Sequence, residues 1–366
     1  MSRLLSLGRS AGAVGATLGV AAAGAAVGFA AERYAVGRSL RRDDPYADEP
    51  FGSLRGSPVP VKTDDGVALH VEVDEADGPV TVVFTHGYAL NLDSWHFQRR
   101  DLRGKARLVF WDQRSHGRSG PAPEGSVSLE RIGADLGAVV DEVAPDGPVV
   151  LVGHSMGGMT ILALAASRSE LFGERVAGVA LIATSARDLG GVSLGLPGPL
   201  GRVAQRVAPG IVATLARRPE LIERGRRAGS DLGYVLTRRY SFVKGGSPAL
   251  VEFTALMNAA TPIDVVAEFL PLFSGHDMLA ALPVLAEMPA LVVGAVGDLL
   301  TPVEHSRELA EALPSATYVE VPDAGHMVIL ERHEVVTAHL GELLDQVARA
   351  ARARRTQSRR LWRRRT

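Results

Sequence analysis

Residues 149–158 read Val149-Val-Leu-Val-Gly-His-Ser-Met-Gly-Gly158, and an apolar, alanine-rich run follows over 159–166. The four apolar residues at the start of this stretch predict a buried strand, and the run after it predicts a helix. Between them stands the pattern G-x-S-x-G with Ser155 at its centre. Its glycines permit a sharp turn that lifts the serine clear of the sheet. Ser155 is therefore a candidate nucleophile, although a glycine-rich turn around an ordinary serine shows the same short pattern.

A serine hydroxyl needs a base to take its proton and a third group to orient that base. The apolar run 290–296 predicts another buried strand, which leads directly to Asp298. The short run 317–321 predicts a further strand, and His326 lies on the loop after it. Open α/β sheets place their chemistry at the carboxyl ends of the strands. Ser155, Asp298 and His326 also follow one another along the chain in the order expected when the serine lies on this type of turn.

A developing oxyanion needs hydrogen-bond donors, and a fourth segment supplies a candidate. The apolar run 80–84 predicts a buried strand that opens into Thr85-His-Gly-Tyr88. The glycine lets this loop pass close to a substrate. The backbone N–H groups of Tyr88 and Met156 are the predicted oxyanion hole. We interpret His86 as structural, holding the loop by hydrogen bonds.

Together these motifs resemble those of the serine-dependent α/β-hydrolase superfamily, in particular the esterases and monoacylglycerol lipases that carry Gly-His-Ser-Met-Gly-Gly. The resemblance covers roughly residues 55–348. It rests on the turn itself and on four further stretches: His86-Gly87, Asp112–Ser119, Asp298 with Thr301-Pro302, and Gly325-His326. The family pattern usually has glycine where this chain has Ser115. Related dehalogenases and epoxide hydrolases carry aspartate at the nucleophile position, so Ser155 argues against both.

The resemblance implies an α/β-hydrolase fold, with a mostly parallel sheet, helices on both faces and a helical cap. Apolar runs alternate with helical patterns over 55–184, and the pattern returns over 286–348. Residues 185–285 show no strand pattern, and we expect them to form the cap. Residues 1–54 and 349–366 flank this domain.

The resemblance also implies a function. We expect hydrolysis of carboxylic esters with an apolar acyl chain, through an acyl-enzyme on Ser155 and with no metal or organic cofactor. Alternatives are hydrolysis of thioesters, lactones or carbon–carbon bonds, acyl transfer, and a non-catalytic membrane-associated binding protein. Candidate residues for the acyl site are apolar side chains of the cap: Phe242, Phe253, Leu256, Met257, Phe269, Leu272 and Phe273.

Two other carboxylates compete with Asp298 for the role of the acid. Some relatives place the acid after the strand that here ends near residue 183, which makes Asp188 the rival. Asp323 lies only three residues before His326 on one tight loop, so it is poorly placed to reach the far ring nitrogen. We predict Asp298 as the acid and keep Asp188 as the alternative.

Composition agrees with a large folded enzyme. The 366 residues are 46% hydrophobic and 22% charged, which is enough for a sizeable core. The absence of cysteine excludes disulfides and thiolate metal sites. We find no phosphate loop and no dinucleotide fingerprint after a strand.

The two ends of the chain predict membrane association. Residues 10–31 carry no charge, and a helix of that length would just cross a hydrocarbon core of ~30 Å. The segment is mostly alanine and glycine, so a cleaved signal peptide or a soluble arm are alternatives. Four arginines follow it, which favours a cytoplasmic catalytic domain. Residues 349–366 hold nine arginines and no acid. They would face anionic lipid, or else form a disordered tail with nucleic acid as a non-specific partner.

Overall fold

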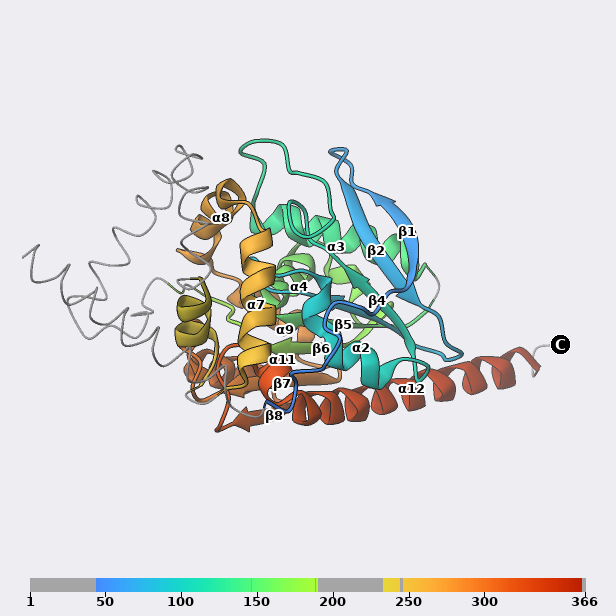
Figure 1. Cartoon of the computed structure of the whole chain (residues 1–366). Helices are drawn as coiled ribbons and strands as arrows, with labels where there is room; N and C mark the ends of the chain where they lie inside the picture. Colours follow the sequence, from blue (N-terminus) through green and yellow to red (C-terminus); the bar gives the residue numbers. More distant parts are fainter. Residues whose placement is uncertain (1–43, 146, 188, 190–232, 244–245, 364–366) are drawn as a thin grey trace, which may run out of the picture.

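The computed structural model describes residues 44–363 except 146, 188, 190–232 and 244–245. Its strands form one sheet in the order β1-β2-β4-β3-β5-β6-β7-β8. Strand β2 pairs antiparallel with β1 and β4, and all other neighbours are parallel (Figure 1). The strands are β1 Ser57–Lys62, β2 Ala68–Asp74, β3 Thr81–Thr85, β4 Arg107–Trp111, β5 Val149–His154, β6 Val176–Ile182, β7 Ala290–Ala295 and β8 Ala316–Val321.

Helices cover both faces of this sheet, which confirms the predicted fold class. The α-helices are α2 His96–Leu102, α3 Leu129–Val143, α4 Met156–Ser167, α7 Pro248–Ala260, α8 Ile263–Phe269, α9 Leu282–Leu285, α10 Val303–Ala312, α11 Val328–Glu331 and α12 His333–Arg363. The 3-10 turns are η1 Leu92–Trp95, η2 Ser169–Leu171, η3 Leu270–Phe273 and η4 Leu279–Ala281.

The strand β5 shows how the sheet separates two apolar cores. Val150 and Val152 point to the face covered by α2 and α12, whereas Val149 and Leu151 point to the face covered by α3 and α4. Because side chains alternate along a strand, an uninterrupted apolar run fits a strand buried on both faces. This burial fixes the position of the turn that follows β5.

The strand β1 was not predicted from the sequence. It reads Ser-Pro-Val-Pro-Val-Lys and lies at the edge of the sheet, where β2 is its one partner among the strands that the structure describes. Pro58 and Pro60 have no N–H to donate, which an edge strand tolerates because only one of its sides is paired. Most of β1 is exposed or half-buried, so it lacks the apolar run that marks the central strands.

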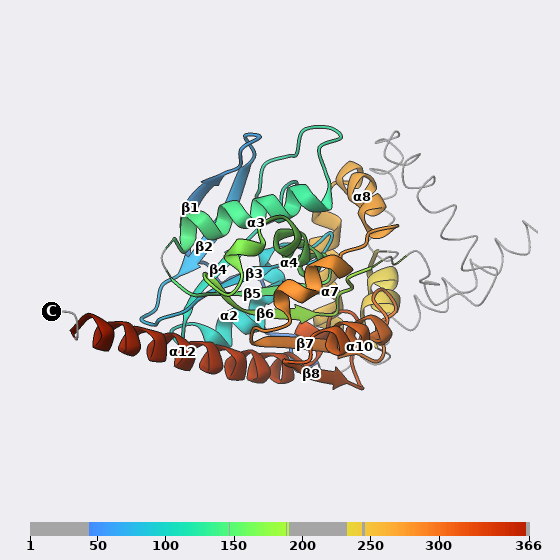
Figure 2. The same ribbon diagram turned by 180° about the vertical axis from the view of Figure 1, so that it is seen from behind.

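The C-terminal helix differs from expectation. The sequence predicts one helix around Val328–Val347 that closes the sheet, but the helix breaks at Arg332 and α12 then continues to Arg363. No glycine or proline follows Gly341, and alanine and arginine are strong helix formers. The predicted basic tail is therefore helical over most of its length, rather than a disordered tail. Figure 2 shows α12 projecting beyond the sheet.

The described part of segment 185–285 contains a helix over 233–241, followed by α7, α8 and α9. Among the residues that the structure describes, no single helix is both long and apolar enough to span a bilayer. One pair reaches that length and composition only when its two parts, bent by 89°, are combined: Pro248–Ala260 with Ile263–Phe273. The predicted apolar segment 10–31 lies outside the described residues.

Residues 44–56, which we call the N-terminal strap, precede β1 in the chain and contact α7. Asp44 accepts hydrogen bonds from the Ser247 hydroxyl and from the Ala249 N–H at the start of α7. Phe51 stacks on Phe253 of α7, with ring centroids 4.5 Å apart. The strap therefore ties the cap helix α7 to the body of the protein.

Candidate active site

Ser155 occupies the turn between β5 and α4 in a backbone conformation that side chains rarely adopt, with φ 54° and ψ −121°. The conformation costs on the order of 1–3 kcal/mol and persists because the surroundings impose it. A Cβ on Gly153 would lie 2.5 Å from the carbonyl carbon of Gly157, and one on Gly157 would overlap the carbonyl oxygen of Thr85. Glycine is therefore required on both sides of the serine.

The structure brings together the three residues predicted as nucleophile, base and acid. The Nε2 atom of His326 lies 2.9 Å from Oγ of Ser155, and its Nδ1 lies 2.8 Å from Oδ2 of Asp298. All three side chains are buried, and Ser155 is 8% exposed. The three residues lie after the carboxyl ends of β5, β7 and β8. This is the relay of contacts that a serine nucleophile needs.

The Asp298 carboxylate is held by its own loop. Its Oδ1 accepts the backbone N–H groups of Leu300 and Thr301, at 2.8 and 2.9 Å. Its Oδ2, which faces His326, lies 2.7 Å from the Thr301 hydroxyl. Asp323 is exposed in this structure. Asp188, the alternative acid, lies outside the described residues.

The predicted oxyanion donors flank the serine. A Cβ on Gly87 would lie 3.2 Å from Cβ of Ser155, so the loop that carries Tyr88 passes directly beside the nucleophile. Met156 is the first residue of α4, and its N–H therefore has no acceptor one turn earlier in the helix. The hydroxyl of the Tyr88 side chain donates to the carbonyl of Val266 in α8.

His86 holds the oxyanion loop, as interpreted from the sequence. Its Nδ1 donates to the carbonyl of Gly87 at 2.7 Å, and its Nε2 accepts the N–H of Gln113 at 3.0 Å. Burial lowers the pKa of His86 to about 4, so the ring is neutral. Gln113 also donates to the carbonyl of His86 and accepts the Thr160 hydroxyl of α4. The oxyanion loop and the nucleophile helix are thus linked through one glutamine.

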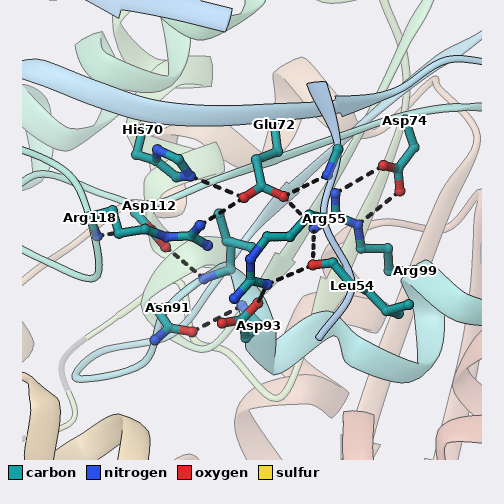
Figure 3. A network of polar contacts seen from close by, with 12 residues as sticks. Leu54, Arg55, His70, Glu72, Asp74, Asn91, Asp93, Arg99, Asp112 and Arg118 are labelled. Atoms are coloured by element: carbon teal, nitrogen blue, oxygen red, sulfur yellow. Dashed lines mark hydrogen bonds and ion pairs between the residues drawn. The ribbon is translucent and has the colours of Figure 1, made fainter. Parts of the chain in front are cut away.

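A network of charged side chains holds the segment that follows the oxyanion loop (Figure 3). Asp112, which is fully buried, accepts the N–H of Leu92 at 2.7 Å and the N–H of Arg118 at 2.9 Å. Arg118 also pairs with Glu72 on β2, and Glu72 pairs with Arg99 on α2. The network therefore fixes the segment that follows the oxyanion loop to β2 and α2.

The sequence motif indicates no role for His154, and the structure shows that it contacts the catalytic base. Its Nε2 donates to the carbonyl of His326 at 2.8 Å. Burial lowers the pKa of His154 to about 3, which keeps the ring neutral. Only the three-dimensional fold brings these two residues together, since they are separated by 172 positions along the chain.

An apolar cluster lies at the start of α4, next to Ser155. It contains Met156, Met159 and Phe269, with Leu272 and Phe273 packed at its edge. The other predicted acyl-site residues lie elsewhere. Three of them pack in the core against α2 and α12: Phe242, Phe253 and Met257. Leu256 is 64% exposed.

Ser115, the departure from the family pattern, has a positive φ of 64°. Glycine adopts this conformation without cost, which explains why glycine is usual here. The Ser115 hydroxyl accepts the N–H of Ala122 at 2.9 Å. This contact partly offsets the cost of the serine backbone.

Comparison with known proteins agrees with the fold. The family model described as alpha/beta hydrolase fold matches residues 80–333, and the chain belongs to this family. An esterase from Thermogutta terrifontis is 28% identical, with a TM-score of 0.62, and the match covers 80% of this chain and 99% of that one. An enol-lactonase from Burkholderia xenovorans is 26% identical, with a TM-score of 0.60, over 76% of this chain and 97% of that one.

Among curated proteins, one relative is the dihydrolipoyllysine-residue acetyltransferase component of an acetoin cleaving system from Pseudomonas putida. It is 26% identical over 266 residues, which is 72% of this chain and 63% of that protein. A putative non-heme bromoperoxidase from Mycobacterium tuberculosis is 48% identical, but over only 48 residues, 13% of this chain and 18% of that protein. The chain therefore spans less than two thirds of the length of these two relatives.

Proposed function

We propose that this enzyme hydrolyses carboxylic esters with an apolar acyl chain. The observation that carries the proposal is the contact of His326 Nε2 with Ser155 Oγ at 2.9 Å, with Asp298 on the opposite nitrogen. In the proposed reaction His326 takes the proton of Ser155 as Oγ attacks the ester carbonyl. Asp298 holds the ring in the required tautomer and stabilises its protonated form.

The remaining steps use the same groups. The backbone N–H groups of Tyr88 and Met156 stabilise the oxyanion of the tetrahedral intermediate. His326 then gives its proton to the leaving alcohol as the bond to the acyl carbon breaks. Water attacks the acyl-enzyme with His326 again as the base, which releases the acid and restores Ser155.

The apolar acyl chain and the ester chemistry are each supported by one observation. Met156, Met159 and Phe269 form a buried apolar cluster at the nucleophile helix, and the half-buried Leu272 and Phe273 lie at its edge. An alkyl chain packed on these edge residues would leave water. The esterase from Thermogutta terrifontis also supports ester chemistry, because it covers most of the chain at 28% identity.

A lactone is the second candidate substrate. A lactone is a cyclic ester, so the same steps would open its ring without releasing a separate alcohol. The enol-lactonase from Burkholderia xenovorans, at 26% identity, favours this candidate.

The test is a substrate panel measured as kcat/KM. It contains nitrophenyl acetate, butyrate and octanoate, a monoacylglycerol, an anionic ester and a simple lactone, with Ser155→Ala as the blank. The proposal expects the highest value on a medium-chain ester or the monoacylglycerol. A clear preference for the anionic ester would contradict the apolar acyl site, and a preference for the lactone would select the second candidate.

A further inference from the structure

The loop that carries His326 is packed against the returning segment of the cap, residues 241–243, which we call the cap return. A Cβ on Gly325 would lie 2.9 Å from the carbonyl oxygen of Ser241. A Cβ on Gly297, which precedes Asp298, would lie 2.6 Å from Cγ1 of Val243. The cap return therefore contacts both the loop of the base and the loop of the acid.

Glu331 joins these two parts of the protein. It ends α11 and is 6% exposed. Its Oε2 accepts the N–H of Gly325 at 2.6 Å, and its Oε1 accepts the N–H of Val243 at 3.1 Å. One buried carboxylate thus binds the residue before His326 and the cap return at the same time.

The backbone around His326 is held on every side. Gly325 donates to Glu331, the carbonyl of His326 accepts from His154, and the N–H of Met327 donates to the carbonyl of Ser241 at 2.9 Å. Among the residues that the structure describes, Glu331 makes no ion pair. A buried carboxylate without a cationic partner is costly, and two backbone donors offset only part of that cost. Packing alone gives no reason for a charge at this position.

We propose that Glu331 is a positioning residue for the catalytic base: it fixes Gly325, and hence His326, relative to the cap return. The proposal rests on the proposed function only in that His326 acts as the base for Ser155. Loss of the carboxylate would leave two buried N–H groups without an acceptor. The loop would then shift, and a displacement of about 1 Å in a catalytic group can cost about a hundredfold in rate.

The test compares Glu331→Gln and Glu331→Ala with the wild type. Glu287→Gln is the matched control, since Glu287 is exposed. The readout is the rate of Ser155 modification by a fluorophosphonate, together with kcat and KM on the best ester of the panel. Rates are normalised to the folded fraction, which urea unfolding measures. The two Glu331 variants guard against a single variant that fails to fold.

The proposal expects a fall in the modification rate and in kcat of roughly 10- to 100-fold for Glu331→Ala, with KM within threefold. Glu331→Gln keeps one acceptor oxygen, so its modification rate and kcat should lie between those of the wild type and Glu331→Ala. Glu287→Gln, the control, should match the wild type. Modification of the folded fraction within twofold of wild type in both variants would overturn the proposal. If the wild type itself is not modified at Ser155, the proposed function fails instead, so the two failures are distinguishable.

Discussion

Ser155 and the residues around it are arranged by contacts that leave little freedom. The strained backbone of the serine is enforced by Gly157, whose Cα faces the carbonyl of Thr85 without room for a side chain. The base is oriented on one side by Asp298 and on its backbone by His154. Geometry of this kind is set before a substrate arrives, which is what lowers the cost of reaching the transition state.

The acid is tested by exchanging carboxylates for amides. Asp298→Asn should lower kcat by roughly 10⁴-fold, because the amide favours the wrong tautomer of His326. Asp188→Asn should change kcat less than threefold. Both variants are measured on the same nitrophenyl ester, with thermal unfolding as the check on the fold. The opposite ranking would move the acid to the loop after β6.

The buried carboxyl of Glu331 should make the free energy of unfolding depend on pH. Burial raises the pKa of its carboxyl from 4.5 to about 7, and the N–H groups of Gly325 and Val243 oppose the shift. Arg332 lowers the same pKa and Asp298 raises it. Since the folded-state pKa is the higher one, the stabilising contribution is complete below pH 4.5 and is lost as the pH rises through 7.

Glu331→Gln does not titrate and should remove this loss. The free energy of unfolding of the wild type relative to that of the variant should fall by up to about 3 kcal/mol between pH 4.5 and pH 8. Urea unfolding at several pH values measures it, with Glu287→Gln as the control. A constant difference across this range would show that the carboxyl of Glu331 titrates normally.

Among the elements, the central strands are predicted well from the sequence, because each of them is a continuous apolar run. The turn at Ser155 and the loops after β7 and β8 follow from those strands, which is why Asp298 and His326 could be named. Strand β1 is not predicted from the sequence, because most of it is exposed or half-buried and it contains two prolines. The role of Glu331 is not predicted for another reason. Its partners are the backbone N–H groups of Gly325 and Val243, and no residue pattern indicates contacts with backbone groups.

The cap residues show the same limit. Seven apolar residues were candidates for the acyl site, but apolar character alone does not say which side of a helix faces the nucleophile. Phe269 lies with Met156, whereas Phe253 of α7 packs on Phe51 of the N-terminal strap. The strap itself has no sequence signal, since its contacts are made with α2 and α7.

The contacts of the N-terminal strap with α7 predict that the strap holds this cap helix in place. Phe51→Ala removes the ring that stacks on Phe253 and contacts Phe97, with centroids 4.5 and 5.8 Å apart. Because Phe51 is half-buried, we expect a loss of roughly 2 kcal/mol in unfolding free energy and faster protease cleavage near α7. Phe172→Ala, a half-buried ring that packs on the other apolar core, the one covered by α3 and α4, is the control. Equal cleavage of α7 in both variants would contradict a holding role.

At the scale of the whole molecule, charge is divided unevenly along the chain. Residues 349–366 carry nine arginines in a protein whose formal net charge is −1. The structure places most of this segment on the projecting part of α12, away from the loops of the active site (Figure 1). A basic helix in this position can approach an anionic surface without blocking the site.

We therefore propose membrane association through both ends of the chain, with the catalytic domain on the cytoplasmic side. Deleting residues 1–42 should release most of the protein into the soluble fraction of a cell lysate. Deleting residues 349–366 should weaken the remaining binding to vesicles that contain anionic lipid, and added salt should have a smaller effect on this variant. A secreted protein with a mature N-terminus after residue 23 would contradict this topology.

Intact-protein and peptide mass spectrometry after exposure to a fluorophosphonate tests directly whether Ser155 is a nucleophile activated by His326. In the wild type we expect one added phosphonyl group, located on Ser155. In Ser155→Ala we expect none, and in His326→Ala a rate of modification at least about 10³-fold lower. Stoichiometric modification of a different residue, or equal rates in the wild type and His326→Ala, would show that His326 does not activate Ser155.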